Sequence, residues 1–207
     1  DTEVRLETLQ QEEQAQIQEP IVEEQVGGED KINWGRFGLD IVETLILAVI
    51  LFLAINAMSA RVRVDGFSMR PTLDDGEFVL VSKMNYLFGA PQRGDIIVFH
   101  FPLKLDEELI KRVIGLPGDH VSIQTGTVYV NGQMLDEPYI AATPSYSGEW
   151  NVLAGQLFVL GDNRNNSNDS KDWGLLPVKN VVGKAVLIYW PPPLWDVIQH
   201  PQLLPSQ

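Results

Sequence analysis

GFSMRPTL, residues 66–73, marks the point at which the chain changes character. A long apolar run ends at residue 60, and after residue 73 the sequence consists of short strand-like runs separated by turn-forming residues. Within the stretch, Ser68 is a candidate nucleophile, but a serine hydroxyl reacts poorly unless a base lies beside it. If Ser68 is catalytic, its partner must therefore come from elsewhere in the chain.

Lys111 is the best candidate for that base. It stands in the strand-like run ELIKRVIGLPGD, residues 108–119, directly after an apolar pair. The three histidines lie in no triad-like setting, and Ser68 lacks the Gly-x-Ser-x-Gly turn of the α/β-hydrolases. A lysine can act as a base near pH 7 only if its pKa falls by about 3 units from roughly 10.4, which burial among apolar groups can achieve. From the residues alone, non-catalytic roles remain open: Ser68 could cap a helix, and Lys111 could be a surface residue of its strand.

Composition narrows the class of protein. A chain of 207 residues allows one modest domain with appendages, and its 44% apolar content is enough for a core. There is no cysteine, which excludes disulfides and thiolate metal sites, and the three scattered histidines form no metal-binding pattern. The sequence therefore predicts no metal and no other cofactor. A net charge of −13 argues against nucleic acid as a partner.

The first 60 residues divide into a tail and a membrane anchor. Residues 1–36 carry ten acidic and three basic side chains, which predicts a solvated, disordered tail. Residues 37–60 form a 24-residue apolar run, about 36 Å long as a helix and able to span roughly 30 Å of hydrocarbon. Two alternatives fit this run less well. A cleavable signal peptide would have a shorter apolar core, and a core helix of a soluble protein would be amphipathic, with apolar residues on one face only. We expect one transmembrane helix in a lipid bilayer, and the flanking charges give no orientation.

Residues 61–190 predict a mainly β domain with antiparallel strands. The strand-like runs lie at residues 62–65, 77–82, 96–101, 109–114, 120–124, 127–130, 157–160 and 182–190. Asn131-Gly132 predicts a type I′ hairpin turn, and residues 141–154 are expected to form a connecting loop and possible lid. Residues 191–207 begin with three prolines, which cannot continue a strand, so we expect a Pro-rich C-terminal tail.

Four ordered blocks follow the hydrophobic anchor. They read SMxPTL (68–73), RGDIIVF (93–99), KRxxGxPGD (111–119) and GDNRxNSxDS (161–170). This pattern, from about residue 37 to about residue 190, resembles the type I signal peptidases, also called leader peptidases. The resemblance implies a single-pass cell-membrane protein with its catalytic domain outside the cytoplasm. It also implies a serine endopeptidase that removes N-terminal signal peptides from exported preproteins.

The resemblance also assigns roles to individual residues. Ser68 is expected to be the nucleophile, and Lys111 the base that takes the Ser68 proton and returns it to the leaving amine. Arg112 should point to the opposite face of its strand and have a structural role. Ser167 is expected to hydrogen-bond the lysine, and Asp169 to stabilise that corner of the site. The block that contains them would otherwise be an ordinary polar turn.

Two positions depart from the commoner family pattern. Lys171 stands where an arginine usually follows Asp-Ser, so its pairing with Asp169 is expected to be a single-point contact. Gly66 stands where some relatives have a serine whose hydroxyl supports the oxyanion hole. The second oxyanion donor should then be a backbone N–H or a water, and Gly66→Ser should keep or raise kcat. If the backbone at Gly66 instead requires a positive φ, both Gly66→Ala and Gly66→Ser should lose activity and stability together.

Specificity is expected to come from apolar walls around the nucleophile. Met69 and Leu73 beside Ser68, with Leu109 and Ile110 before the lysine, are the candidate substrate-binding residues. Walls of that size leave room for small side chains at the −3 and −1 positions of a signal peptide. The substrate would pair as an extended strand with the strand of Lys111.

Two other functions remain open at this point. One is a self-cleaving Ser/Lys domain of the repressor type, against which the anchor and the absence of a DNA-binding helical unit argue. The other is a membrane-tethered β-domain that binds partner proteins without catalysis. Loss of Ser68 or Lys111 would favour this second alternative, and the sequence retains both residues.

Overall fold

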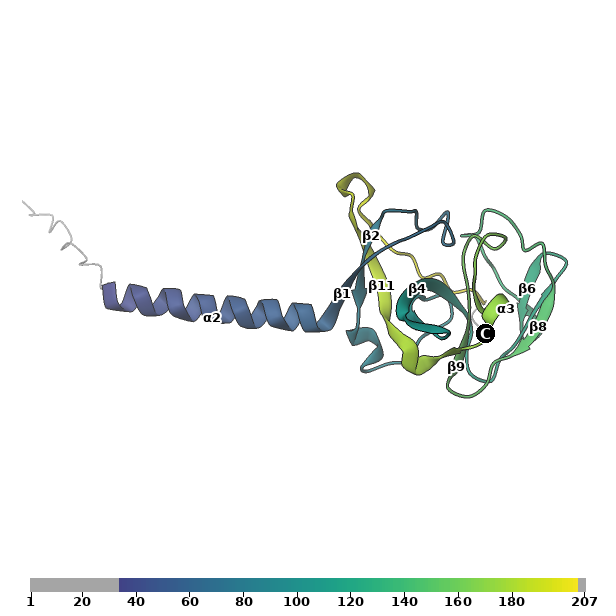
Figure 1. Ribbon diagram of the computed structural model, residues 1–207, viewed down its shortest axis with the longest axis horizontal. Helices are drawn as coiled ribbons and strands as arrows, with labels where there is room; N and C mark the ends of the chain where they lie inside the picture. The colour runs from purple at the N-terminus through teal and green to yellow at the C-terminus, as the bar shows by residue number, and fades with distance from the viewer. Residues whose placement is uncertain (1–33, 205–207) are drawn as a thin grey trace, which may run out of the picture. The chain divides into compact units, whose positions relative to one another are not determined.

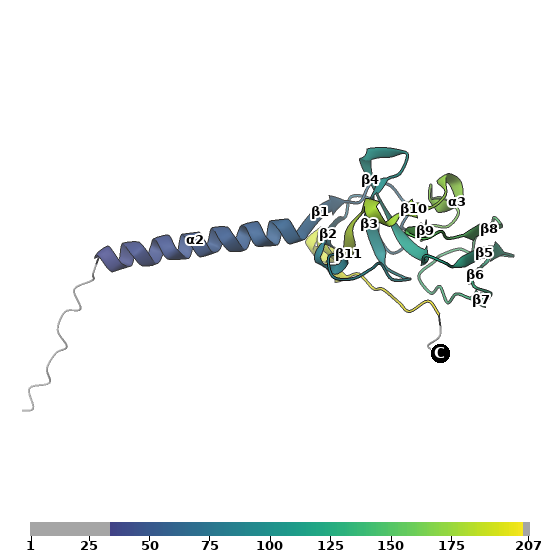
Figure 2. The same ribbon diagram turned by 90° about the horizontal axis from the view of Figure 1, so that it is seen from below.

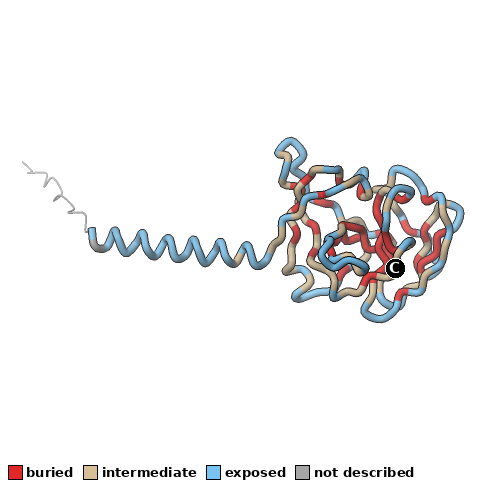
Figure 3. Tube along the Cα trace, viewed as in Figure 1, coloured by how far each residue is buried: buried red, intermediate tan, exposed pale blue. Residues whose placement is uncertain are grey.

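A computed structural model describes residues 34–204 of the chain. The predicted acidic tail therefore lies, apart from its last three residues, outside the described part. The first described element is the helix α2, Trp34–Met58, whose 25 residues measure about 37 Å along the axis. Residues 36–58 have a mean hydropathy of 2.4, and none of them is buried (Figure 3). A helix that is apolar all round and has no packed face is the kind that spans a bilayer.

A large antiparallel sheet forms most of the β body (Figure 1). Its strand order is β1-β2-β11-β3-β4-β9-β10, and β12 pairs with β11. The strands are β1 Ser59–Arg63, β2 Phe78–Ser82, β3 Ile96–Phe101, β4 Lys104–Gly115, β9 Gln156–Leu160, β10 Leu176–Pro177, β11 Val181–Trp190 and β12 Asp196–Val197. Four short helical segments connect them: η1 Met84–Tyr86, α3 Ser170–Trp173, η2 Val178–Asn180 and η3 Pro192–Leu194.

A second, smaller sheet has the order β7-β6-β5-β8 (Figure 2). Its strands are β5 His120–Gln124, β6 Thr127–Val130, β7 Gln133–Met134 and β8 Gly148–Asn151. The turn between β6 and β7 has positive φ at both Asn131 and Gly132, as a type I′ hairpin requires. Each predicted strand-like run overlaps an observed strand, and the prediction of a mainly antiparallel β fold is confirmed.

The segment 141–154 was expected to be a loop, and that prediction is wrong for its second half. Gly148–Asn151 forms β8, which pairs with β5 along the edge of the smaller sheet. Trp150 explains the strand, because its ring packs on Phe158 with centroids 4.7 Å apart. Packing of one large aromatic side chain against a buried ring outweighs the weak strand pattern of the local sequence.

The chain after Trp190 packs on both apolar clusters of the body. Ile198 is 5% exposed within the cluster of the larger sheet, and Leu203 is 1% exposed within the cluster of the smaller sheet. The two tryptophans around the start of this segment are not held in the same way, since Trp190 is 52% and Trp195 68% exposed. The segment 191–204 is therefore anchored to the β body by the buried side chains of Ile198 and Leu203, and not by the exposed tryptophans.

Candidate active site

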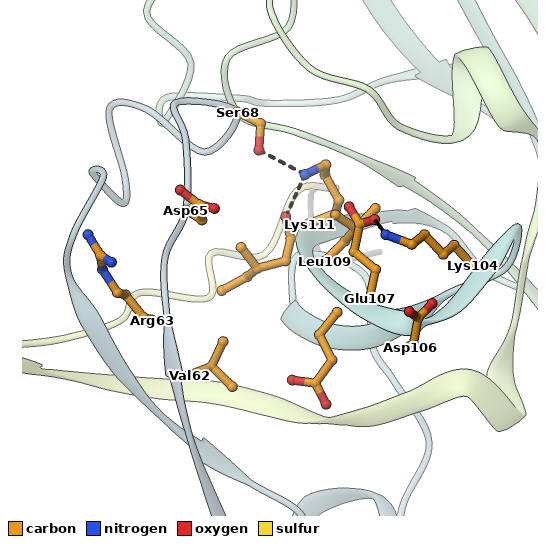
Figure 4. A pocket seen from close by; sticks show the side chains of 11 residues that line it. Val62, Arg63, Asp65, Ser68, Lys104, Asp106, Glu107, Leu109 and Lys111 are labelled. Carbon is orange, nitrogen blue, oxygen red and sulfur yellow. Dashed lines mark hydrogen bonds and ion pairs between the residues drawn. The ribbon is translucent and has the colours of Figure 1, made fainter.

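Ser68 lies in the turn that leaves β1, and the backbone around it is held from both sides. Its carbonyl oxygen accepts a hydrogen bond from the Asn163 N–H at 3.0 Å, and the Asn163 side chain donates to the Phe67 carbonyl at 3.0 Å. Lys111, on β4, brings its Nζ to 2.8 Å from the Ser68 Oγ (Figure 4). The two residues that the sequence singled out, 43 positions apart, are therefore in direct hydrogen-bond contact.

Lys111 is buried, although it is a lysine. Only 3% of the surface of Lys111 is exposed, and its Nζ also donates a hydrogen bond to the Ile110 carbonyl at 2.9 Å. Burial lowers the pKa of Lys111 from 10.5 to about 8, and the negative charge of Asp169 opposes part of that shift. An amine with this pKa has an appreciable neutral fraction near neutral pH, so it can accept the Ser68 proton.

This pKa predicts the pH dependence of the reaction. If neutral Lys111 is the base, kcat/KM should rise about tenfold per pH unit below pH 8 and level off above it. The sign follows because the folded-state pKa is depressed and the active form is the deprotonated one. Initial rates on a peptide substrate between pH 5.5 and 9.5 measure the profile. A plateau that already begins at pH 6 would contradict Lys111 as the titrating base.

Arg112, the next residue, points away from Lys111 and into a buried ion pair. Its Nε and Nη2 donate to the two carboxylate oxygens of Asp162 at 2.8 and 2.7 Å, and the two side chains are 1% and 0% exposed. Asp162 also accepts a hydrogen bond from the Thr72 hydroxyl at 2.5 Å. One carboxylate thus ties the turn of Ser68 to the strand of Lys111, which gives Arg112 the structural role expected from strand alternation.

The sequence analysis expected Asp169 to stabilise this corner of the site and Ser167 to hydrogen-bond Lys111. Asp169 accepts the Gly161 N–H at 3.0 Å, caps α3, and meets Lys171 Nζ in a single-point contact at 3.3 Å, as the sequence predicts. The Ser167 Oγ is buried without a hydrogen-bond partner in the described part of the chain. The predicted bond from Ser167 to Lys111 is therefore absent in this structure, where Nζ donates to Ser68 and to a backbone carbonyl instead.

Gly66 adopts a conformation that side chains disfavour. Its φ is +86°, and its N–H donates to the Asp75 carboxylate at 2.8 Å. That N–H is therefore already engaged and does not point freely at an oxyanion. Of the two alternatives left by the sequence, the structure favours the one in which the backbone needs glycine.

Both Gly66→Ala and Gly66→Ser should therefore lower the free energy of unfolding, by about 1–2 kcal/mol each. The space beside Gly66 is open, so the loss comes from the left-handed backbone and not from a clash. Urea unfolding of both variants measures it. Unchanged midpoints, together with a raised kcat in Gly66→Ser, would restore the other alternative.

A cavity of about 340 Å³ opens beside Ser68 and Lys111 (Figure 4). Its apolar walls are Val62, Leu109 and Ile110, and its remaining lining is polar. The polar side chains are Arg63, Asp65, Lys104, Asp106, Glu107 and Glu108. Leu109 and Ile110 are thus where the sequence analysis expected them. Val62 and the polar lining were missed, because nothing local in the sequence indicates that β1 faces the first part of β4.

Met69 and Leu73, the other two predicted substrate-binding residues, do not line this cavity. They are 1% and 0% exposed and belong to the apolar core under the larger sheet. Their proximity to Ser68 in sequence misled the prediction, because the turn directs Ser68 outward and its apolar neighbours inward. Among residues 34–204, no three His, Asp or Glu side chains are grouped closely enough to hold a metal ion.

The strand of Lys111 has a free edge next to the cavity. β3 pairs with one side of β4 from Lys104 to Arg112, whereas β9 pairs with the other side only from Arg112 onward. Residues 108–111 therefore have no neighbouring strand on that second side within the described chain. Free backbone N–H and carbonyl groups at such an edge can pair with an added extended peptide.

Comparison with known proteins identifies the family of the chain. The family model for "Signal peptidase, peptidase S26" matches residues 38–190. A "Signal peptidase I" of Leptolyngbya laminosa is 46% identical over 159 residues, covering 72% of this chain and 78% of that protein. A "Probable signal peptidase I-2" of Synechocystis sp. is 44% identical over 162 residues, covering 75% and 74%. The "Thylakoidal processing peptidase 1, chloroplastic" of Arabidopsis thaliana is 37% identical over 173 residues, covering 78% and 50%. A match across this much of the chain, which includes both Ser68 and Lys111, shows that the chain belongs to the signal peptidase family, peptidase S26.

Proposed function

We propose that this peptidase removes the signal peptides of exported preproteins with Ser68 as the nucleophile and Lys111 as the general base. The observation that carries the proposal is the 2.8 Å contact between Lys111 Nζ and Ser68 Oγ, made by a lysine that is only 3% exposed. An exposed lysine would stay protonated near neutral pH and would activate nothing. Burial and contact together supply both conditions for a Ser/Lys pair.

The reaction follows from these two groups. Neutral Lys111 takes the Ser68 proton while Oγ attacks the scissile carbonyl, whose oxygen receives a hydrogen bond from the Ser68 N–H. The protonated lysine then gives the proton to the departing amine, which is the new N-terminus of the mature protein. The signal peptide remains as an ester on Ser68. Water, deprotonated by Lys111, hydrolyses the ester and returns both side chains to their initial states.

Substrate recognition is proposed to use the free edge of β4. A signal peptide that pairs with residues 108–111 binds through its backbone, so its sequence can vary. Alternate side chains of that added strand would face the apolar wall that Val62, Leu109 and Ile110 form beside the nucleophile. Small residues at the −3 and −1 positions fit these walls, and larger ones collide with them.

Cleavage of a purified preprotein tests this function. A preprotein with alanine at −3 and −1 should be cut once, at the end of its signal peptide, as mass spectrometry of the product would show. The same preprotein with leucine at −1 should be cut at least about tenfold more slowly, because the wall leaves no room for it. Equal rates on the two preproteins would contradict the proposed pocket. The Ser68→Ala protein provides the background rate.

The apolar helix and the family indicate association with a membrane. We propose that α2 spans a cell membrane once and that the β body lies on its extracytoplasmic side, where exported preproteins emerge. Protease added to the outside of sealed, right-side-out vesicles should then digest the β body. Digestion of the acidic tail with the β body protected would reverse the assignment.

A further inference from the structure

His200 bridges two strands of the larger sheet. It belongs to the C-terminal segment, residues 196–204, which runs from the larger sheet to the smaller one (Figure 2, yellow). The direct pairing of β3 with β11 ends at Ile97. One position further on, the Ile96 N–H donates to His200 Nδ1 at 3.3 Å, and His200 Nε2 lies 3.0 Å from the Ala185 carbonyl oxygen. The imidazole ring thus stands where the next backbone hydrogen bond between the two strands would be.

Only the neutral form of this ring fits both partners. Because Nδ1 accepts a hydrogen bond, the single ring proton sits on Nε2, which donates it to the Ala185 carbonyl. A protonated imidazole carries a hydrogen on each nitrogen and would direct one of them at the Ile96 N–H. Only 17% of the His200 side chain is exposed, so little water is at hand to replace the lost hydrogen bond. Protonation therefore weakens the attachment of the segment.

The charges around the ring do not favour a second cation. Asp95, just before β3, lies 3.8 Å from His200 Nδ1, but the same carboxylate oxygen is 2.6 Å from Lys184 Nζ on β11. The other oxygen of Asp95 accepts a hydrogen bond from the Tyr86 hydroxyl at 2.9 Å. Burial lowers the pKa of His200 from its ordinary 6.5, and Lys184 and Arg112 of β4 lower it further, while Asp95 opposes part of the shift. Because the folded-state pKa is lowered, the stabilisation by the ring is complete above about pH 6.5 and is lost as the pH falls below it.

The segment that His200 holds also supports the catalytic turn. Ile198 belongs to the buried cluster that contains Met69 and Leu73, both of which lie close to Ser68 in the chain. Leu203 belongs to the buried cluster of the smaller sheet. Departure of the segment would uncover both clusters, including the apolar core behind the turn of Ser68.

We propose that His200 is a pH-sensitive latch. Its neutral ring holds residues 196–204 on the β body, and protonation releases them, which opens the core behind Ser68. The inference depends neither on the chemistry of Ser68 and Lys111 nor on membrane insertion of α2.

Amide hydrogen exchange of the full-length protein in detergent micelles tests the latch. Three N–H groups are hydrogen-bonded only while the segment is in place. These are Ile96, which donates to the ring, Ile198, which donates to a β11 carbonyl, and Asp136, which donates to the Leu203 carbonyl. Their protection factors, corrected for the intrinsic exchange rate, should fall between about threefold and about 30-fold from pH 7.5 to pH 5.0. One proton bound with an ordinary pKa of about 6.5 in the released segment permits no larger change. The Val152 N–H, which donates to a carbonyl outside the segment, should keep its protection factor.

The three histidines provide the matched variants. His200→Gln keeps one acceptor and one donor but does not titrate, so the pH dependence of the three protection factors should disappear. His100→Gln and His120→Gln change side chains that are 47% and 44% exposed, and both variants should keep it. A change below twofold in the unchanged protein would overturn the proposal, as would an undiminished change in His200→Gln.

A second measurement needs no variant at His200 to fold. The ring of His200 is titrated by nuclear magnetic resonance in the unchanged protein and in a synthetic peptide of residues 196–204. The midpoint should be lower in the protein than in the peptide. An equal or higher midpoint in the protein would mean that Asp95 stabilises the charged ring in place, and the latch would be refuted. Exchange and titration are used instead of cleavage rates because Lys111 also loses its neutral form on acidification.

Discussion

Lys111→Ala should lower kcat/KM at least about 10³-fold, because no other described side chain forms a hydrogen bond with the Ser68 Oγ and could replace the amine as a base. Lys111→Arg should be equally inactive, since a guanidinium stays protonated throughout the pH range of the assay. The measurement is the rate on a preprotein at pH 8.5, with circular dichroism to show that the β fold is retained.

Two controls make this expectation specific. Lys104 lines the same cavity but is 60% exposed and pairs with Glu107, so Lys104→Ala should retain most of the activity. Ser68→Ala should be as inactive as Lys111→Ala, and the double variant should be no worse than either one, because the two groups act as a unit. More than a tenth of the activity remaining in Lys111→Ala would exclude the proposed mechanism.

Gly161→Ala is expected to be the most damaging change outside the catalytic pair. A methyl group at Gly161 would overlap the Ser68 carbonyl oxygen and the Ser167 hydroxyl, and would lie 2.6 Å from the Ser167 Cβ. Overpacking of this kind costs about 1–3 kcal/mol of stability. The chain relieves the overlap by moving Ser68, and a displacement of about 1 Å from Lys111 can lower kcat by about 10²-fold. Steady-state kinetics and thermal unfolding measure the two effects.

Gly115→Ala separates the loss of stability from the loss of activity. Its methyl group would lie 2.7 Å from Val121 and 2.9 Å from Val152, in the core of the smaller sheet and without contact to Ser68. This variant should unfold at a lower temperature but retain kcat/KM at temperatures at which it is folded. If Gly161→Ala behaves in the same way, the close approach of Gly161 to Ser68 is not important for catalysis.

The sequence predicted the strands well because their patterns are local. Alternating apolar residues bounded by Gly, Pro and Asn located each run, and Asn131-Gly132 determined its hairpin without help from the rest of the chain. β8 was missed for the opposite reason. Its place in the sheet depends on the packing of Trp150 against Phe158 of the larger sheet, a contact between two sheets that the local pattern of residues does not reveal.

The candidate site, too, was predicted only in part from the sequence. Ser68 and Lys111 were identified because their block pattern resembles a known family, and their 2.8 Å contact agrees with it. The pocket was only half predicted, since Met69 turned into the core and Val62 entered the cavity from another strand. Which neighbour of a nucleophile faces the substrate depends on the three-dimensional course of a turn, and adjacency in sequence does not determine it.

The burial of Ile198 and Leu203 has a consequence for how the molecule matures. Both residues complete apolar cores whose other buried residues precede them in the chain, one core in each sheet. A ribosome delivers the chain from its N-terminus, so these two side chains are among the last to arrive. The earlier strands can pair while synthesis continues, but both cores stay open at one side until residues 198 and 203 have left the ribosome. The β body is therefore completed only after the anchor and all the described strands of both sheets have been synthesised.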